Sequence, residues 1–352
     1  MPNARATHLT RRGILAAGGA LGLGAVLAAC GDDDAKSGGS DSSSSPSAKA
    51  TAAGPWTFKD DRGTTVKLDK TPSTIVAFVG VGAALHDYGV EVKGVFGPTR
   101  TADGKADVQA GDMDVTKVEI LGNIWDEFNV EKYAALAPDV LISTMFDSAG
   151  TLWYVPEASK DKIAKLAPSV GISVFDRQLT APLERMWELA ESLGADMTAA
   201  KVTAAKKRFE DAATRLRAAA KAKPDIKVLV GSASAELFYV SGSNLSIDLE
   251  YFKALGVNFV EPPADVLKAS GGWYESLSWE NVDKYPADVI LMDDRTSAIQ
   301  PAAITKETWK KLPAVKAGQV IPRSTEPILS YDKCAPLLEN LAEAIEKAKK
   351  VS

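Results

Sequence analysis

Histidine and cysteine are scarce in this chain, which has only two of each in 352 residues. The histidines are His8 and His86, and the cysteines are Cys30 and Cys334. A protein-ligated zinc or copper site usually needs three or four such ligands, so the sequence argues against one. Only His86 could serve a serine–histidine–aspartate triad, and no Gly-x-Ser-x-Gly sequence, Walker sequence or dinucleotide-binding glycine pattern follows a predicted strand. Catalysis therefore has little support, although a carboxylate-based hydrolase stays open.

The general composition is that of a globular protein in water, with 45% hydrophobic and 25% charged residues. A length of 352 residues suits two domains of ordinary size. The formal net charge is −5. Because nucleic-acid partners require a basic surface, this acidic balance argues against them.

The N-terminus carries export signals rather than part of the fold. Arg11-Arg12 precedes the apolar segment Gly13–Ala29, as in twin-arginine signal peptides. The segment ends in Leu27–Gly31, which resembles the lipobox cut by the lipoprotein signal peptidase. The sequence therefore predicts a signal peptide over residues 1–29 and a lipidated Cys30, which would hold the protein on the extracytoplasmic face of the cell membrane.

Residues 30–54 are acidic and then rich in serine, glycine and alanine, which predicts a flexible tether. Cleavage before Cys30 removes three arginines and no acidic residue, so the formal charge moves from −5 to −8. Cys334 is then the one remaining thiol, and no disulfide within the chain is available.

Strand-like and helix-like segments alternate in two regions, 55–181 and 224–352, which indicates α/β lobes with mostly parallel sheets. Between them, residues 182–223 are rich in alanine, lysine, arginine, glutamate and leucine at helical spacing. Gly194 interrupts this pattern and Pro224 ends it. The sequence predicts a pair of helices, or one long broken helix, linking an N-terminal lobe to a C-terminal lobe.

A repeat relates the two lobes, because residues 129–142 are echoed at residues 278–291. Asn129 and Ser278 are suitable N-caps for a short helix. Each copy then has a proline, an aspartate and an uninterrupted apolar run, as expected of a strand covered on both faces.

The spacing within the repeat is also preserved. Glu131 precedes Asp139 by the same step as Glu280 precedes Asp288. A glutamate in the first turn of a helix suits the positive end of the helix dipole. An aromatic residue precedes each glutamate by an equal step, Trp125 in the first copy and Tyr274 in the second.

Ligands of open α/β sheets lie beyond the carboxyl ends of the strands, and several aromatic residues and Arg295 fall in such positions here. Further aromatic candidates are expected in loops, at Trp153, Tyr154, Tyr239 and Tyr331. This combination suits a bulky, amphipathic ligand. The predicted ligand-binding residues are Phe78, Arg100, Trp125, Phe146, Trp153, Tyr154, Tyr239, Trp273, Tyr274, Arg295 and Tyr331.

Four segments together resemble the lipid-anchored substrate-binding proteins that serve ABC importers of ferric siderophores and cobalamin. These are Thr71–Val76, Asn129–Val140, the helical region 182–223 and Leu312–Val320. The resemblance covers the chain from Trp56 to the C-terminus. It implies two Rossmann-like lobes joined by one long helix, with a ligand cleft between them and small hinge motion.

The resemblance also implies roles for the repeated residues. In this family a glutamate on each lobe docks into arginine pockets of the dimeric permease, which works with a cytoplasmic ATPase. Glu131 and Glu280 match the positions of these glutamates. In proteins of this family, the residue at the position of Trp125 and Tyr274 often contacts the ligand. The chain is thus expected to be a monomeric binding protein without catalytic residues, a bound cofactor or a metal site of its own.

Manganese- and zinc-binding relatives use several histidines, so a metal carried by this chain should arrive already chelated. Catecholate siderophores are strongly anionic and call for several cations, whereas few cations are expected near the cleft. A ferric hydroxamate siderophore is therefore the preferred ligand. The alternatives are cobalamin or haem bound by the same fold, a secreted carboxylate-based hydrolase, and an adhesin or sensor subunit without transport.

Overall fold

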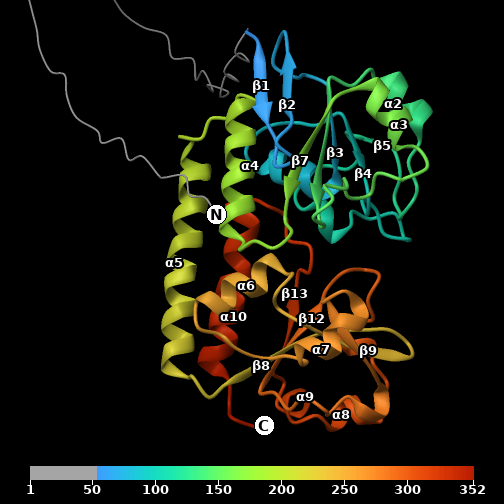
Figure 1. The fold of residues 1–352 in the computed structure, drawn as a ribbon. Coiled ribbons are helices and arrows are strands. Elements are labelled where there is room, and N and C mark those ends of the chain that lie inside the picture. Colours follow the sequence, from blue (N-terminus) through green and yellow to red (C-terminus); the bar gives the residue numbers. More distant parts are fainter. Residues whose placement is uncertain (1–53) are drawn as a thin grey trace, which may run out of the picture. The chain divides into compact units, whose positions relative to one another are not determined.

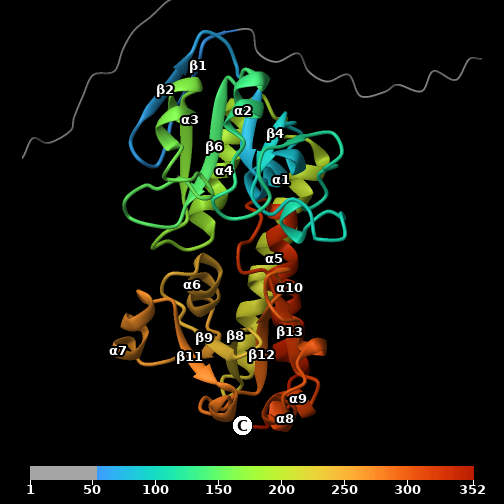
Figure 2. The same ribbon diagram turned by 90° about the vertical axis from the view of Figure 1, so that its right-hand side faces the viewer.

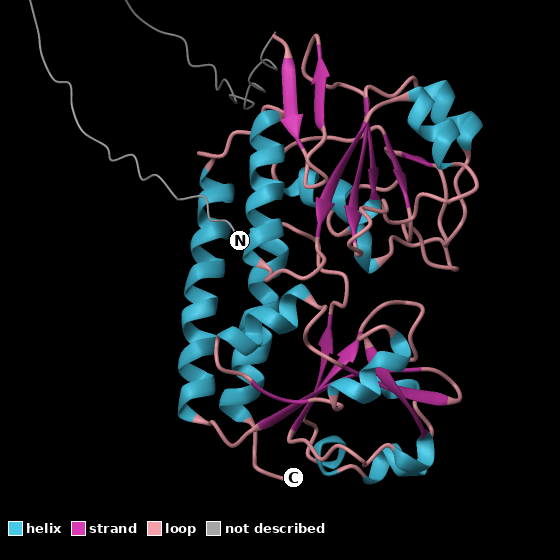
Figure 3. Ribbon diagram, viewed as in Figure 1, coloured by secondary structure: helices cyan, strands magenta, loops and turns pink. Residues whose placement is uncertain are grey.

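The computed structural model describes residues 54–352, and this part of the chain forms two α/β lobes (Figure 1). The predicted fold class, two Rossmann-like lobes, is confirmed. In each lobe the helices flank the strands (Figure 3). Cys30 and the predicted signal peptide lie outside the described residues.

The N-terminal lobe contains a parallel five-stranded sheet with the strand order β5-β4-β3-β6-β7. β3 and β6 are fully buried, as their continuous apolar sequences predict. A separate antiparallel hairpin, β1–β2, precedes this sheet. The strands are β1 (Trp56–Lys59), β2 (Thr65–Leu68), β3 (Ile75–Phe78), β4 (Gly94–Phe96), β5 (Glu119–Ile120), β6 (Val140–Met145) and β7 (Ser169–Ser173). The helices are α1 (Val79–Asp87), the 3₁₀ helix η1 (Val108–Ala110), α2 (Val130–Leu136) and α3 (Lys160–Leu166).

The C-terminal lobe has the strand order β11-β9-β8-β12-β13, and β10 also pairs with β8. Unlike the sheet of the first lobe, this sheet is mixed, because β9 runs antiparallel to both of its neighbours. The strands are β8 (Lys227–Ala233), β9 (Leu237–Ser241), β10 (Asn258–Val260), β11 (Tyr274–Ser278), β12 (Val289–Asp293) and β13 (Val320–Arg323). The helices are α6 (Ile247–Ala254), α7 (Ala264–Leu267), η2 (Lys268–Ser270), η3 (Trp279–Asn281), η4 (Pro301–Ala303), α8 (Glu307–Lys311) and α9 (Pro313–Lys316).

The helical region between the lobes is a pair of helices, α4 (Thr180–Ser192) and α5 (Ala200–Ala222). Gly194 follows α4 with a φ of 94°, a conformation that glycine adopts without strain. The final helix, α10 (Tyr331–Lys347), lies beside α5, and both views show the two helices together along one side of the lobes (Figures 1 and 2). The lobes are therefore connected by two adjacent helices, α5 and α10, rather than by α5 alone.

Ion pairs tie α5 to α10 in a parallel arrangement. Arg208 pairs with Glu339, and Arg215 pairs with Glu346, each with a closest distance of 2.6 Å. In both pairs the guanidinium donates through two nitrogens, and such bidentate contacts fix the relative register of the helices.

The N-terminus of α10 is in turn bound to the first lobe. The Lys333 ammonium group lies 2.6 Å from the Asp112 carboxylate, and the Ser330 hydroxyl donates to Asp87. The backbone N–H of Tyr331 donates to the Tyr88 hydroxyl. α10 thus contacts both lobes.

The repeated aspartates have the same structural role in both lobes. The Asp139 carboxylate accepts from the backbone N–H groups of Ser73 and Thr74 just before β3. Asp288 accepts from the backbone N–H of Lys227 at the start of β8. Each aspartate therefore joins the beginning of the strand that follows it, β6 or β12, to the beginning of a neighbouring parallel strand, β3 or β8.

The helix starts of the two copies differ. Asn129 caps α2 as predicted, because its side chain accepts from the N–H of Lys132 at 2.9 Å. The prediction for Ser278 is wrong, since its side chain makes no capping hydrogen bond and only the 3₁₀ turn η3 follows. Within residues 54–352, no helix has the length and apolar character needed to cross a bilayer.

Candidate functional site

A cavity of about 670 Å³ lies between the two lobes. The first lobe contributes aromatic side chains from the carboxyl ends of β3 and β6, and the second contributes residues from the ends of β8, β12 and β13. This placement follows the rule that ligands bind beyond the carboxyl ends of parallel strands. The predicted residues that line the cavity are Phe78, Phe146, Trp153, Tyr239, Trp273, Tyr274 and Arg295.

The wall formed by the first lobe is aromatic. Phe146 packs against Trp153 with ring centroids 4.6 Å apart, and Phe78 stacks on Tyr154 at 5.5 Å. Trp125 packs edge-on against both Trp153 and Tyr154 from outside the cavity lining. The backbone N–H of Trp153 donates to the Thr144 carbonyl, which fixes the loop that carries the indole. The result is a continuous apolar surface for the hydrophobic part of a ligand.

The wall formed by the second lobe is more polar. It contains Ser232 and Ser234 from the end of β8, and Tyr239 and Ser241 from β9. Tyr239 packs edge-on against Tyr274 at 5.2 Å. A ligand in the cavity would therefore contact hydroxyl groups and ring edges on this side.

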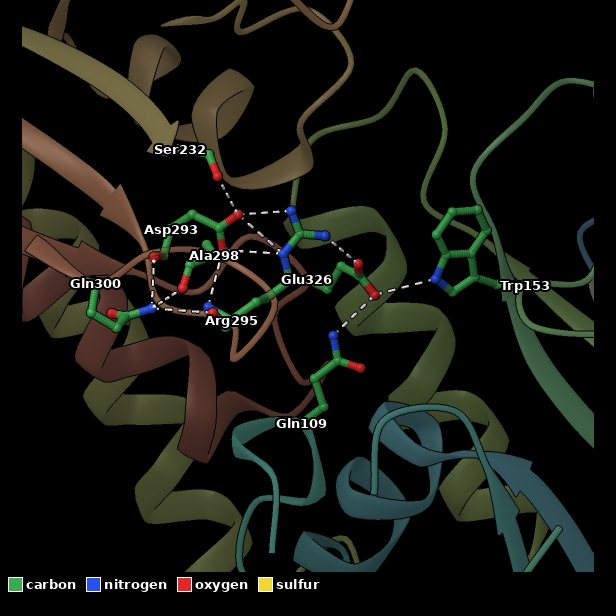
Figure 4. A network of polar contacts seen from close by, with 8 residues as sticks. All are labelled: Gln109, Trp153, Ser232, Asp293, Arg295, Ala298, Gln300 and Glu326. Atoms are coloured by element: carbon green, nitrogen blue, oxygen red, sulfur yellow. Dashed lines mark hydrogen bonds and ion pairs between the residues drawn. The ribbon is translucent and has the colours of Figure 1, made fainter. Parts of the chain in front are cut away.

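Three residues of the cavity lining, Asp293, Arg295 and Glu326, form an ionic network (Figure 4). The guanidinium of Arg295 lies 2.7 Å from Asp293 Oδ2 and 2.8 Å from Glu326 Oε1. Burial lowers the pKa of Arg295, but the hydrogen bond and charge of Asp293 and the charge of Glu326 outweigh it and raise the pKa. Burial raises the pKa of Asp293, and the contacts with Arg295 reverse the shift, so that this pKa is lowered. The Arg295–Asp293 pair is therefore charged at neutral pH.

Glu326 also connects the two lobes. Its second carboxylate oxygen, Oε2, accepts from Gln109 Nε2 and from Trp153 Nε1, each at 3.2 Å. Gln109 and Trp153 belong to the first lobe, whereas Arg295 belongs to the second, and Figure 4 shows Glu326 between them. Glu326 thus joins the aromatic wall to the ionic network.

Arg323, the second arginine of the lining, is already neutralised. It forms a bidentate ion pair with Asp248, with two N–O distances of 2.8 Å, and both side chains are buried. The lining carboxylates are Asp147, Asp293 and Glu326, and none of the three was predicted from the sequence. With Asp248 included, carboxylates outnumber guanidinium groups around the cavity by two.

Two buried hydroxyl groups in the lining have no hydrogen-bond partner among the described residues. They are Oγ1 of Thr144, at the end of β6, and Oγ1 of Thr325, just after β13. A buried polar atom without a partner is energetically unfavourable. A polar ligand group could satisfy either hydroxyl.

Four predicted ligand-binding residues do not line the cavity. Arg100 donates to the carbonyls of Gly104 and Val115 and so stabilises its own loop. Tyr331 begins α10 rather than lying in a loop, and it packs in the core against Trp187 and Phe209.

The other two are Trp125 and Tyr154, which lie behind the aromatic wall. Trp125 is 52% exposed to solvent, although it does not line the cavity. Burial raises the pKa of Tyr154 to about 12, so its hydroxyl stays neutral.

The two predicted docking glutamates are exposed. Glu131 lies in the first turn of α2, and Glu280 lies in η3. The backbone N–H of Glu280 and the hydroxyl of Ser278 lower the pKa of Glu280, which keeps the carboxylate charged.

The sequence contained a signal for two of the residues that the prediction missed. The rule of strand carboxyl ends led to Arg295 after the predicted strand 289–292. Applied in the same way after the predicted strand 319–321, it leads to Arg323 and Glu326.

A group of three carboxylates outside the cavity, Asp87, Asp112 and Asp332, has oxygen atoms within 4.8 Å of one another. The ammonium group of Lys333 contacts Asp112 and Asp332, so a cation is already supplied by the chain. His86 is paired with Glu91 on the surface and does not line the cavity.

Comparisons with known proteins fit this geometry. Residues 96–323 match a family described as "Periplasmic binding protein". The chain is 79% identical to DesE, a ferric-siderophore receptor protein from Streptomyces coelicolor; the match covers 85% of this chain and 100% of DesE, with a TM-score of 0.84.

More distant structures share the fold. The siderophore periplasmic binding protein from the fuscachelin gene cluster of Thermobifida fusca is 22% identical, with a TM-score of 0.58 and coverage of 78% of this chain and 96% of that chain. SirA of Staphylococcus aureus, solved with staphyloferrin B, is 19% identical, with a TM-score of 0.57 and coverage of 84% and 99%. No curated protein sequence matched the chain.

Proposed function

The chain belongs to the periplasmic binding protein family, and we propose that it captures a ferric siderophore of the hydroxamate type outside the cytoplasm and delivers it to an ABC importer. The family was predicted from the sequence, and that prediction is confirmed. Identity of 79% to a ferric-siderophore receptor over the whole of that protein is the observation that carries the ligand class.

The cavity has the size and chemistry for such a ligand. Its volume of about 670 Å³ lies within the range of roughly 300–1,000 Å³ typical of small-molecule sites. One aromatic wall and one hydroxyl-rich wall suit a chelate whose linkers are apolar and whose metal-binding groups are polar.

The charge of the cavity favours a hydroxamate over a catecholate. A ferric tris-catecholate is trianionic, whereas ferric trihydroxamates are neutral or carry a pendant ammonium group. Arg295 and Arg323 are both paired with carboxylates, and Asp147 and Glu326 add further negative charge. A polyanion would be repelled, because like charges in a site of low dielectric interact strongly.

Delivery would depend on Glu131 and Glu280. Each is an exposed carboxylate on a different lobe, and the two lie in equivalent positions of the repeat. A permease dimer with two equivalent basic pockets would accept such a pair. The lipid on Cys30 and the tether of residues 30–54 would keep the monomeric protein at the extracytoplasmic face of the membrane.

The test is ligand titration followed by tryptophan fluorescence, because Trp153 and Trp273 line the cavity. The full chain with Cys30→Ser would be titrated with ferrioxamine, ferrichrome, a ferric catecholate, cyanocobalamin and haem, with correction for ligand absorption. Saturable quenching at submicromolar concentration by a hydroxamate alone is the expected result. Quenching only by the catecholate, cobalamin or haem would overturn the ligand choice. No binding of any of them, confirmed by calorimetry, would overturn the function and favour a hydrolase or a sensor.

A further inference from the structure

Glu326 occupies an unusual position in the chain. It lies between β13 and α10, in the segment by which the chain returns from the second lobe to the first. Its side chain is 10% exposed and belongs to the cavity lining. A residue of this segment therefore faces the cavity while it contacts both lobes.

The charge of Glu326 is not needed to neutralise Arg295. Asp293 already contacts the Arg295 guanidinium through Nε and Nη2 and is almost fully buried beneath it. Glu326 accepts a hydrogen bond from the Arg295 guanidinium through Nη1 only. The three groups together carry one net negative charge, and Glu326 is the member that faces the first lobe.

The hydrogen bonds of Glu326 to the first lobe come from neutral donors, the indole N–H of Trp153 and the amide of Gln109. Neutral donors stabilise a carboxylate without cancelling its charge. The field of the Glu326 carboxylate therefore extends into the cavity beside the aromatic wall.

We propose that Glu326 tunes the charge selectivity of this binding protein, because its carboxylate leaves the Asp293–Arg295–Glu326 network beside the aromatic wall with one net negative charge. Neutral and cationic ferric chelates are then accepted, and polyanionic ones are rejected. This inference rests on the proposed function, since it concerns the same cavity. Glu326 also positions Trp153, and the two roles can be separated by substitution.

The magnitude follows from Coulomb's law. At a separation of about 10 Å and an effective dielectric constant of about 20, removal of one negative charge changes binding roughly ten-fold per unit of ligand charge, less in high salt. For a trianionic chelate compared with a neutral one, the ratio of affinities should therefore change by up to about a thousand-fold without screening, and by at least about ten-fold when salt screens the charges.

The experiment compares Glu326→Gln, Glu326→Asp and Thr296→Val in the full chain carrying Cys30→Ser. Glu326→Gln removes the charge and keeps the shape, whereas Glu326→Asp keeps the charge and shortens the reach to Trp153. Thr296 donates to Asp107 across the lobes at 2.8 Å and does not line the cavity, so Thr296→Val removes an inter-lobe hydrogen bond at constant cavity charge. Dissociation constants for a ferric trihydroxamate and a ferric tris-catecholate would be measured by calorimetry at two salt concentrations, with thermal unfolding as a check of folding.

We expect the ratio of the two affinities to shift in favour of the ferric tris-catecholate in Glu326→Gln only, and to shift more at low salt than at high salt. An equal loss of affinity for both chelates in Glu326→Gln would overturn the inference and leave Glu326 a structural residue. The same shift of the ratio in Glu326→Asp or Thr296→Val would also overturn it. If the parent protein binds neither chelate, the proposed function itself fails, which is a distinct outcome.

Discussion

The two copies of the repeat preserve one feature and lose another. Asp139 and Asp288 both hold the start of a neighbouring parallel strand through backbone N–H groups. The helix between glutamate and aspartate is retained as α2 in the first lobe and reduced to the 3₁₀ turn η3 in the second. Both copies have an exposed glutamate, although only the first copy places it in an α-helix. The difference indicates that the aspartate serves the fold, whereas the glutamate is not maintained by local helix stability.

Removal of both glutamates should have the largest effect on function. Glu131→Ala with Glu280→Ala is expected to abolish uptake and to leave ligand affinity within a few-fold of the parent, because neither residue lines the cavity. Uptake of labelled ferric siderophore by cells, together with membrane localisation of the variant, measures this. The matched control is Glu157→Ala with Glu236→Ala, one residue in each lobe and neither in the cavity lining. Normal uptake by the double variant would contradict the proposed docking role of Glu131 and Glu280.

Loss of an aspartate should reduce stability more in the second lobe than in the first. Asp288 accepts from Lys227, Val351 and Ser352 backbone N–H groups and from Lys350, and its side chain is fully buried. Asp288→Ala leaves these donors without their acceptor and should cost about 3 kcal/mol.

Asp139 has fewer partners and is only partly buried, so Asp139→Ala should cost about 1–2 kcal/mol. Urea denaturation of both variants measures the difference, and the exposed Asp283→Ala serves as a control expected within about 0.5 kcal/mol of the parent. Equal costs for the two aspartates would contradict the comparison.

The aromatic residue that precedes each glutamate should matter unequally for ligand binding. Tyr274 lines the cavity, whereas Trp125 only supports Trp153 from behind. Tyr274→Ala should lower ligand affinity about ten-fold, and Trp125→Ala about three-fold, since an aromatic contact is worth roughly 0.5–1.5 kcal/mol. Calorimetric titration with the ferric hydroxamate decides the order, and a larger loss for Trp125→Ala would place ligand outside the cavity lining.

The contrast between Asp139 and Asp288 should be smallest in the pH dependence of the free energy of unfolding. Burial raises the pKa values of Asp139 and Asp288, but hydrogen bonds from backbone N–H groups outweigh it, so that both pKa values are lowered. A carboxylate with a lowered native pKa stabilises the fold above its unfolded pKa of about 3.9, and that stability is lost as the pH falls below about 4. Asp288→Asn should therefore flatten the pH dependence of stability below pH ~4 more than Asp139→Asn does. Urea midpoints measured in that range test this, and parallel curves for the parent and both variants would refute it.

The sequence was sufficient for the fold class, because buried strands such as β3 and β6 are continuous apolar runs and the aspartates recur at a fixed step. It also identified every aromatic side chain of the cavity lining, from strand ends and from loops. It could not show the pairing of α10 with α5, since the partners Arg208 and Glu339 are far apart in sequence. For the same reason the contact between Trp153 and Glu326 was not predictable, because it depends on how the two lobes approach each other.

α5 and α10 are bound to each other, and α10 is also bound to the first lobe. The ion pairs of Arg208 and Arg215 hold α5 and α10 in register, and Lys333 fixes α10 to the first lobe. A carrier built this way is expected to change little in size when loaded, which small-angle scattering of empty and loaded protein would test through an unchanged radius of gyration. Cargo that is not enclosed by closing lobes keeps part of its surface facing outward. Under the proposed function, direct contact between an importer and this exposed ligand surface would distinguish the loaded protein from the empty one.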